Sequence, residues 1–556
     1  MKNVKENNDK KSNYFYIGLI VLIWLITYLV CQVLFDQKLG WDEVAYMSVA
    51  KGITENFDFS ARAYTVMGIL KHGYPTHLIN FPIYPIYLAI FFKLFGCSLK
   101  IAYFSTWLSA LGVCILIYYI FLLISEDNKK LAFLVSMSYL FSPGIIKNCD
   151  SALMEQTGCL LLCLAVYFIL KDYVSGNFNH FTILKFSFSF LILWIYKSLF
   201  IGFFFGAFVF ICLAYNSKIS GKKLNTKIPL FLFLTLSYGI FAVLFCILAK
   251  FVFLPVAPMM TFADIQGAQQ LYADFLGGAF VNFPENLIKN MKDFFTIIVS
   301  PYFIYPTYYS KYAPSLLLST SNIILVGVYF FILLIVSTLT LASWKKLSPQ
   351  AKLFVSLTLG TILTFNFIFN FLFTTTFGNI WRYNLYSLPL YLCTLGIVLK
   401  TNYEYLKPFV FDHPRAGSTI FILFFVLGYI PLYLSTIKQY LFMEDAYHTT
   451  AKNNSKIVDT FVQNENPQFI YFSDGIHSTF LRYPMKQVMK EATNEQLEQI
   501  NKILPKSIEY LFLRPSDWLF QNNQDLILKG APIINEQYKY LGFDKDAQIV
   551  VYKLNQ

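Results

Sequence analysis

YFYIGLIVLIWLITYLVCQVLF, residues 14–35, contains no charged side chain. A helix rises ~1.5 Å per residue, so this block is long enough to cross a hydrocarbon core of ~30 Å. It is too long for the apolar region of a signal peptide, and it lacks a small-residue cleavage site. The block therefore predicts a transmembrane helix near the start of a membrane protein.

The composition of the whole chain agrees with this prediction. Of 556 residues, 56% are hydrophobic and 14% are charged, against about 45–50% and 25% in soluble domains. This excludes soluble, fibrous and disordered proteins. The net charge of +12 comes from lysines in short gaps between apolar blocks, a pattern typical of cytoplasmic loops rather than of a nucleic-acid-binding face.

The cysteines do not form a disulfide framework. Most of the nine lie inside apolar blocks, where a free thiol behaves as a small hydrophobic group. Only Cys97 and Cys149 are expected to be exposed.

Ten further blocks are candidate spans, so we predict about eleven transmembrane helices. The additional blocks are 99–124, 131–146, 152–170, 181–196, 198–215, 228–254, 313–342, 353–376, 384–399 and 419–437. One more apolar segment, 82–96, carries two prolines and Lys93 and is too short to cross comfortably.

Charge decides the place of segment 82–96. Four lysines precede the first span, and the lysines of the later gaps lie on the same side only if 82–96 does not cross. We therefore expect 82–96 to lie in the outer leaflet, within a first extracytoplasmic loop of residues 36–98. A third outer loop, 255–312, is rich in aromatic residues that suit a membrane interface.

The composition changes at residue 438. The strand-like runs PQFIYFS, SIEYLFLRP and AQIVVYKL are separated by a charged, helix-like stretch around Lys486–Leu504. We predict a transmembrane module over 1–437 and a small extracytoplasmic α/β domain over 438–556.

Two adjacent carboxylates follow the first span in LGWDEVAYMSVAKGI, residues 39–53. On a short helix over 42–51, Asp42 and Glu43 point about 100° apart, so only one can face a given site. An active-site carboxylate and a helix cap both explain the pattern, since Asp favours helix starts and Glu the first turn.

Other ionisable residues stand at the predicted outer ends of later spans. Asp150 and Glu155 occur in KNCDSALMEQTGCLL, where Glu155 is expected one turn into a span. Lys197 interrupts the apolar run LWIYKSLFIGFFF, and Arg382 stands in NIWRYNLYSLPLY. Ionisable groups near membrane depth are costly, so acids and bases gathered at one membrane face indicate a reaction centre.

Each of these residues also has a structural explanation. Glu155 suits a hydrogen-bonded loop carboxylate paired with Lys147, and Lys197 suits a lysine that extends to the interface. His72 and His77 lie five apart in a loop with Pro and Gly. Their spacing is not that of metal ligands. They are explained by a phosphate site or as polar side chains exposed to water.

Five segments in order resemble the GT-C glycosyltransferases. They are WDEVAY, NFPIYPIYLAIFFKLFG, FSPGIIKNCDSALMEQ, IYKSLFIG and WRYNLYSLPLY, within 36–205 and 378–396. The types that they resemble are bacterial relatives of protein O-mannosyltransferase, aminoarabinose transferases and Rgt-type lipopolysaccharide sugar transferases. The resemblance implies a polyprenyl-phosphate-linked sugar donor and a reaction at the extracytoplasmic face of the cell membrane.

The resemblance also implies roles for residues. The acid after the first span maps onto Asp42, with Glu43 beside it, and the acid of the second outer loop onto Asp150 or Glu155. The residues that then bind the donor phosphate are Lys197 and Arg382, and His77 is a further candidate. This chain departs from the family where the usual His-Pro-Pro is Asn80, Phe81 and Pro82, and where the following arginine is Tyr103 or Phe104.

The chemistry explains these residue types independently. A hydroxyl or amine that attacks an anomeric carbon loses a proton, which a carboxylate within ~3 Å accepts. The leaving lipid phosphate needs fixed cations such as Lys197 and Arg382. We therefore predict an inverting transfer to a lipid, glycan or protein acceptor without a cofactor. A divalent metal held by Asp42 with Asp150 or Glu155 is the less favoured alternative.

Two other functions remain open from the sequence. A transporter or lipid flippase of envelope glycan precursors is the first, although transporters keep ionisable groups near the bilayer midplane and often show inverted repeats. The second is a non-catalytic assembly partner of an envelope glycan complex that docks through residues 438–556. No nucleic-acid partner is expected.

Overall fold

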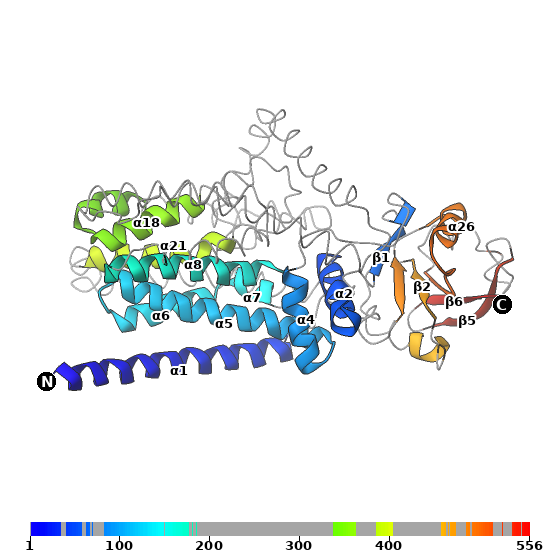
Figure 1. The fold of residues 1–556 in the computed structure, drawn as a ribbon, viewed down its shortest axis with the longest axis horizontal. Helices are drawn as coiled ribbons and strands as arrows, with labels where there is room; N and C mark the ends of the chain where they lie inside the picture. Colours follow the sequence, from blue (N-terminus) through cyan, green and yellow to red (C-terminus); the bar gives the residue numbers. More distant parts are fainter. Residues whose placement is uncertain are drawn as a thin grey trace, which may run out of the picture.

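The structure is a computed structural model, and it places a bundle of helices beside a β-sheet (Figure 1). It describes residues 2–34, 41–57, 63–66, 69–70, 83–149, 151–176, 181, 185, 337–362, 385–403, 457–462, 465, 467–473, 485–489, 492–514, 525, 536–545 and 548–555.

Three helices in the described part are long and apolar enough to cross a membrane. They are α1 (Lys2–Leu34), whose apolar part is Ser12–Val33, α5 (Leu99–Ile124) and α8 (Glu155–Ser175). The predicted spans 14–35 and 99–124 are confirmed as helices. The helix that corresponds to the predicted span 152–170 begins at Glu155, three residues later than predicted. The count of eleven stays a prediction, because most of the later candidate spans lie outside the described residues.

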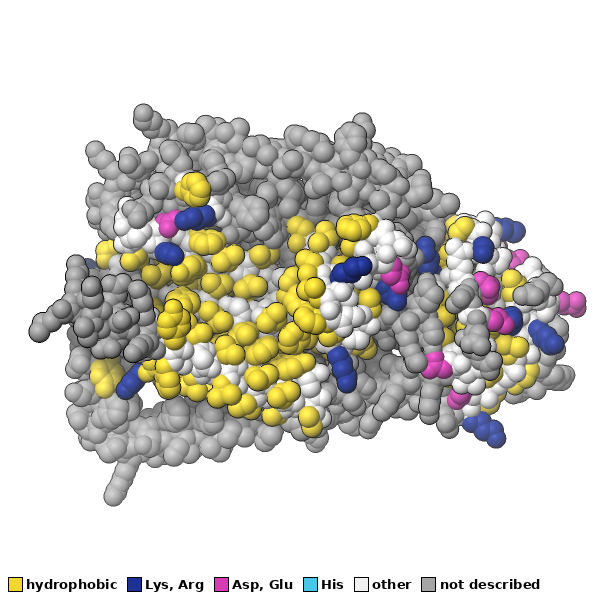
Figure 2. All heavy atoms as spheres, turned by 60° about the horizontal axis from the view of Figure 1, so that its bottom comes forward, with side chains coloured by type: hydrophobic (Ala, Val, Ile, Leu, Met, Phe, Trp, Pro, Cys, Tyr) yellow, Lys and Arg dark blue, Asp and Glu magenta, His cyan; other side chains and the backbone are white. Residues whose placement is uncertain are grey.

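The bundle exposes many large apolar side chains, and contact of so many with water would be unfavourable. On α1, Leu22, Ile26 and Leu29 are each more than half exposed, and Val33 is 85% exposed. In Figure 2 the apolar side chains form a broad patch over the bundle, and charged side chains gather on either side of it. An apolar belt of this size is what lipid covers, so the chain is a helical membrane protein.

The predicted span 131–146 is wrong in one respect, because it is broken. Helix α6 (Lys129–Leu140) ends before Ser142, and a seven-residue helix α7 (Pro143–Cys149) follows. Pro143 lacks an N–H and its ring clashes with the preceding turn, so it can begin a helix but not continue one.

Contacts along the helices set their directions. The Tyr118 hydroxyl donates to Asn13 Oδ1 at 3.1 Å, and Trp24 Nε1 donates to the Trp107 carbonyl at 2.9 Å. Helix α1 is therefore antiparallel to α5. Ser109 meets Thr157 at 3.1 Å and Tyr119 packs on Tyr167, so α8 runs parallel to α5.

One end of the bundle, which we call the basic end, collects lysines. Lys400, at the end of α21 (Leu388–Thr401), donates to the carbonyl of Ser125, which caps α5. The Ser343 hydroxyl donates to Asn402 at 2.8 Å, beside the 3-10 helix η3 (Trp344–Lys346) and ahead of α18 (Pro349–Thr361). The other lysines that these elements bring to the basic end are Lys129, Lys130, Lys171, Lys345 and Lys346.

The opposite end of the bundle receives both limits of loop 36–98. Helix α1 ends there and α5 begins there (Figure 1). Between them α4 (Ile83–Phe95) lies against the first half of α5, where the Tyr87 hydroxyl donates to the Ser105 carbonyl at 3.0 Å. Thirteen residues span ~20 Å, which is short of a bilayer core. The chain thus leaves and re-enters the bundle at one end, as a segment 82–96 without a crossing requires.

The sheet has six strands in the order β1-β3-β2-β4-β6-β5. Strands β1, β3, β2 and β4 are parallel to one another, and β6 is antiparallel to β4 and β5. The strands are β1 (Ala63–Thr65), β2 (Phe469–Phe472), β3 (Lys486–Met489), β4 (Tyr510–Leu513), β5 (Tyr538–Asp544) and β6 (Ile549–Leu554). Strand β1 comes from loop 36–98, far from the others in sequence.

The predicted strands within PQFIYFS, SIEYLFLRP and AQIVVYKL are confirmed, but the helix around 486–504 is only partly right. Residues Lys486–Met489 form a strand, and helix α26 (Asn494–Ile503) begins after a capping box at Thr493. Strand β3 is paired on both sides, so position in the sheet outweighs the polar character of Lys486 and Gln487.

The expected exposure of Cys149 is also wrong. Cys149 is fully buried, because it ends α7 against the bundle core. Cys97 is half-buried, and burial raises the pKa of its thiol.

Candidate functional site

The acidic motif after the first span forms helix α2 (Trp41–Asn56). The short helix predicted over 42–51 is confirmed and is longer than expected. Because α2 begins at Trp41, Asp42 and Glu43 lie within its first turn rather than at the cap. Glu43 is buried with 4% of its surface exposed, and the side chain of Asp42 lies outside the described part.

Helix α2 is held against α4 by polar and aromatic contacts. The Thr54 hydroxyl donates to the Ala50 carbonyl at 2.8 Å and reaches the Ala89 carbonyl of α4 at 3.4 Å. The rings of Tyr46 and Tyr84 meet edge to face with centroids 5.2 Å apart. These contacts fix the face of α2 that carries its first-turn acids.

The second acidic motif supplies Glu155, which is fully buried. It is the first residue of α8 and not, as predicted, one turn inside the span. A carboxylate at a helix N-terminus is stabilised by the unpaired N–H groups of the first turn. The Tyr46 hydroxyl contacts the sulfur of Met154 at 3.4 Å, so α2 reaches the residue next to Glu155.

Tyr84 of α4 connects the two acids. Burial raises the pKa of its hydroxyl well above the ordinary value, the Thr106 hydroxyl opposes this, and the charges of Glu43 and Glu155 raise it further. Both carboxylates therefore lie close enough to act on one phenol, although they come from stretches more than 100 residues apart. The contacts of Tyr46 with Tyr84 and with Met154 bring α2, α4 and the start of α8 together at this place.

Buried hydroxyls extend this cluster into the bundle. The Tyr87 hydroxyl lies 3.0 Å from that of Ser109, which in turn lies 3.1 Å from that of Thr157. These three groups link α4, α5 and α8 close to the end of the bundle that lies opposite the basic end. They fix the spacing of the helices that carry Tyr84 and Glu155.

Two amides near the start of α8 retain unused hydrogen-bonding capacity. Gln156 donates to the Tyr139 hydroxyl, but among the described residues its Oε1 has no hydrogen-bond partner, and neither do the two amide atoms of Asn148. Both side chains are fully buried. An unmet buried polar group costs about 1–3 kcal/mol, so water or a bound polar molecule would stabilise this region.

The segment that follows Arg382 packs against the first turn of α8. The 3-10 helix η6 (Leu385–Ser387) lies so close that a Cβ on Gly158 would come within 2.5 Å of the Tyr386 ring. The Cys159 thiol donates to the Leu385 carbonyl at 3.4 Å. Arg382 itself, three residues before Leu385, lies outside the described residues.

Asp150, Lys197 and His77 also lie outside the described residues, so their predicted roles stay predictions. Within the described part, no group of three His, Cys, Asp or Glu side chains is arranged to hold a metal ion. The metal alternative, Asp42 with Asp150 or Glu155, stays a prediction, because the side chains of Asp42 and Asp150 lie outside the described part. Sequence reasoning missed Tyr84 and Tyr46, although the repeated PIYPIY tyrosines of the short helix were a signal.

Comparison with known proteins gives the fold. No protein-family model matches the sequence, and no curated protein matches it. The structure is similar to that of ArnT from Cupriavidus metallidurans bound to undecaprenyl phosphate, with 12% identity, a TM-score of 0.51 and 97% of each chain covered. The apo state of that protein matches with 12% identity, a TM-score of 0.51, 97% of this chain and 98% of the other.

A weaker likeness is to the archaeal oligosaccharyltransferase AglB from Archaeoglobus fulgidus in complex with an inhibitory peptide and a dolichol-phosphate. It has 11% identity and a TM-score of 0.45, and it covers 97% of this chain and 74% of the other. ArnT and AglB are both GT-C glycosyltransferases. The likeness to ArnT shows that the chain has the GT-C fold, and it confirms at the level of fold the resemblance that the sequence motifs carry.

Proposed function

We propose that this GT-C protein is a membrane glycosyltransferase that moves a sugar from a polyprenyl-phosphate donor to a cell-envelope acceptor. The observation that carries the proposal is that the helices of the buried acids Glu43 and Glu155 meet through Tyr46, which contacts Tyr84 and Met154, at the end of the bundle opposite the basic end. Buried acids that share one site are the usual source of general bases. The undecaprenyl phosphate bound by ArnT supports a lipid phosphate as the leaving group.

The transfer proceeds by direct displacement. The acceptor oxygen or nitrogen forms a bond to the anomeric carbon while the bond from that carbon to the phosphate oxygen breaks. Asp42 or Glu43 takes the acceptor proton, and the phosphate leaves with the bonding electrons. Attack from the face opposite the leaving group inverts the anomeric configuration.

The other candidate residues hold the reacting groups. Lys197 and Arg382, with His77, balance the charge of the leaving phosphate. Glu155 or Asp150 orients the acceptor, and the protonated Tyr84 donates a hydrogen bond to a carboxylate or a sugar hydroxyl. The unused amide groups of Asn148 and Gln156 suit a molecule rich in hydroxyls.

We place the reaction at the extracytoplasmic face of the cell membrane. The basic end carries the lysines expected in the cytoplasm. The candidate acids Glu43 and Glu155 and the sheet lie at the other end (Figure 1). Nucleotide sugars do not reach that face, which is a further reason to expect a lipid-linked donor.

The test is mass spectrometry of envelope lipids and glycoproteins in a deletion strain. We expect one sugar mass to be missing, to return with the wild-type gene, and not to return with Asp42→Asn plus Glu43→Gln at equal membrane level. Full restoration by that double variant contradicts the assignment of the base. Wild-type levels of every sugar in the deletion strain contradict the transferase.

Transport is less well supported. In α5, α8 and the apolar part of α1 no Asp, Glu, Lys, Arg or His stands in the middle, whereas transporters bind their cargo near the midplane. Substrate flux in vesicles without a covalent product would favour transport instead.

A further inference from the structure

We infer that the C-terminal sheet positions the acidic helix α2, and that strand β1 holds the two together. This inference rests on the proposed function, because it gives the sheet a role in the reaction. Strand β1 pairs in parallel with β3, in the register Ala63 to Gln487, Tyr64 to Val488 and Thr65 to Met489. Loop 36–98 therefore completes a sheet whose other strands come from residues 469–554.

The chain between α2 and β1 is short. Helix α2 ends at Asn56 and β1 begins at Ala63, so the connection spans at most about 25 Å even when fully extended. Helix α2 and β1 are also in direct contact. A displacement of the sheet is therefore passed to the helix that carries Asp42 and Glu43.

The apolar side of α2 and the core of the sheet form one hydrophobic cluster. Val66 and Ile69, directly after β1, belong to this cluster and are at most 1% exposed. From α2 it includes Val44, Met47 and Ala50, and from the sheet Tyr471, Val488 and Leu511. Separation of the sheet from α2 would expose this cluster to water, so the two parts are expected to stay together.

Helix α2 is also held by the membrane bundle. Thr54 and Tyr46 contact α4, and Tyr87 of α4 bonds to α5. Figure 1 shows α2 between the bundle and the strands. A helix fixed from both sides keeps its buried first-turn acid in one orientation, which is what a general base requires.

The competing explanation is a tethered domain that docks a partner protein or glycan. In that case the β1–β3 pairing would contribute nothing to the reaction, and the sheet would act on acceptor binding instead. The two explanations predict different kinetic effects when the pairing is broken.

The first experiment tests the pairing without any assay of activity. A protease site is inserted between residues 437 and 457, the purified protein is cleaved in detergent, and co-purification of the tail fragment is measured. We expect the fragment to stay bound. Release of the fragment from the cleaved wild-type protein would overturn the inference.

Proline substitutions in β1 supply matched controls. In an edge strand of a parallel pair, the N–H groups of alternate residues point to the neighbour and those between point away. We expect Ala63→Pro and Thr65→Pro to behave alike and Tyr64→Pro to behave oppositely, with tail release in only one of the two classes. Retention of the tail in all three variants would overturn the role of the pairing.

The second experiment measures transfer by the intact chain with each proline variant. For the class that releases the tail, we expect kcat to fall about tenfold or more while the KM values for donor and acceptor change less than about twofold. An unchanged kcat overturns positioning, and a raised acceptor KM alone favours the docking domain. No transfer by the wild-type protein with any donor contradicts the proposed function, while the co-purification result still decides the pairing.

Discussion

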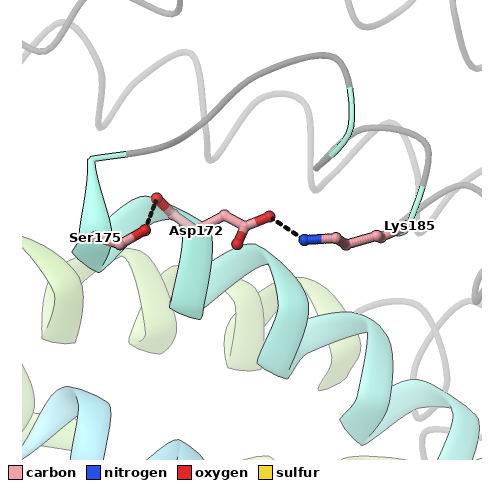
Figure 3. A network of polar contacts seen from close by, with 3 residues as sticks. All are labelled: Asp172, Ser175 and Lys185. Carbon is pink, nitrogen blue, oxygen red and sulfur yellow. Dashed lines mark hydrogen bonds and ion pairs between the residues drawn. The ribbon is translucent and has the colours of Figure 1, made fainter.

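The two ends of α8 hold buried carboxylates in different surroundings. At the basic end Asp172 is 8% exposed, and Lys185 donates to its carboxylate at 3.1 Å, while Ser175 donates to its backbone carbonyl at 3.1 Å (Figure 3). At the other end Glu155 is fully buried and shares its surroundings with Glu43 and Tyr84.

This difference separates a structural acid from a candidate functional one. The ion pair of Asp172 with Lys185 and the hydrogen bond from Ser175 give this acid a role in holding the chain at the end of α8. Glu43 and Glu155 are buried acids that come from separate stretches of sequence, and buried acids gathered in this way are typical of reaction centres. Position in the helix, with an acid at each end, does not reveal the difference.

Neutralisation of each acid in turn tests this comparison most strongly. We expect Glu155→Gln to lower kcat for sugar transfer by about 100-fold or more, because a group that orients reactants or transfers protons is lost. We expect Asp172→Asn to keep kcat within about threefold of wild type, because its role is structural. Steady-state transfer with both variants in the same membranes is the measurement, and equal losses would contradict the distinction.

The close approach at Gly158 gives the next largest effect. Gly158→Ala places a Cβ 2.5 Å from the Tyr386 ring, so we expect the free energy of unfolding to fall by about 1–3 kcal/mol. Gly18→Ala is the control, because no atom lies within 4 Å of a Cβ there. Thermal unfolding in detergent measures both, and a wild-type midpoint for Gly158→Ala would show that η6 does not pack on α8 in this way.

Removal of the Tyr84 hydroxyl tests the surroundings of Glu43 and Glu155 further. We expect Tyr84→Phe to lower kcat by about ten- to 100-fold while the ring keeps its packing against Tyr46. Because burial raises the pKa of Tyr84 well above its usual 10.0, the phenol stays protonated from pH 6 to 9. The ratio of variant to wild-type kcat is thus expected to be constant over that range. A ratio that changes with pH would contradict a protonated donor.

The smallest effect is expected from an exposed acid of the sheet. Glu465 accepts hydrogen bonds from Lys553, at 2.6 Å, and from Tyr510, and these lower the pKa of its carboxyl. A lowered pKa in the folded state gives stability that is present above the unfolded pKa of 4.5 and is lost as pH falls through the folded value.

For Glu465→Gln we therefore expect a loss of less than about 1 kcal/mol at pH 7, because exposed ion pairs are screened by solvent. The loss should shrink as pH falls below 4.5 and vanish once the carboxyl is protonated in both the folded and the unfolded state. Thermal unfolding of the full chain at pH 7 and at pH 3 measures it. A loss of equal size at both values would show that packing rather than charge is responsible.

Much of the fold could be predicted, because its signals are local. Apolar length identified α1 and α5, and alternation with apolar runs identified β2, β4 and β6. The prediction failed where neighbours decide. The strand at Lys486–Met489 and the burial of Cys149 depend on which elements pack beside them, whereas the break at Pro143 had a local signal that the prediction overlooked.

The candidate site divides in the same way. The sequence by itself determined that acids stand at the ends of apolar blocks, since charge and apolar length are properties of neighbouring residues. Only the tertiary structure decided that Glu43 and Glu155 meet at Tyr84 and that Ala63–Thr65 joins the distant sheet. These arrangements join stretches that are far apart in the sequence, and they form because helix packing and strand register bury shared apolar surface, which no local pattern encodes.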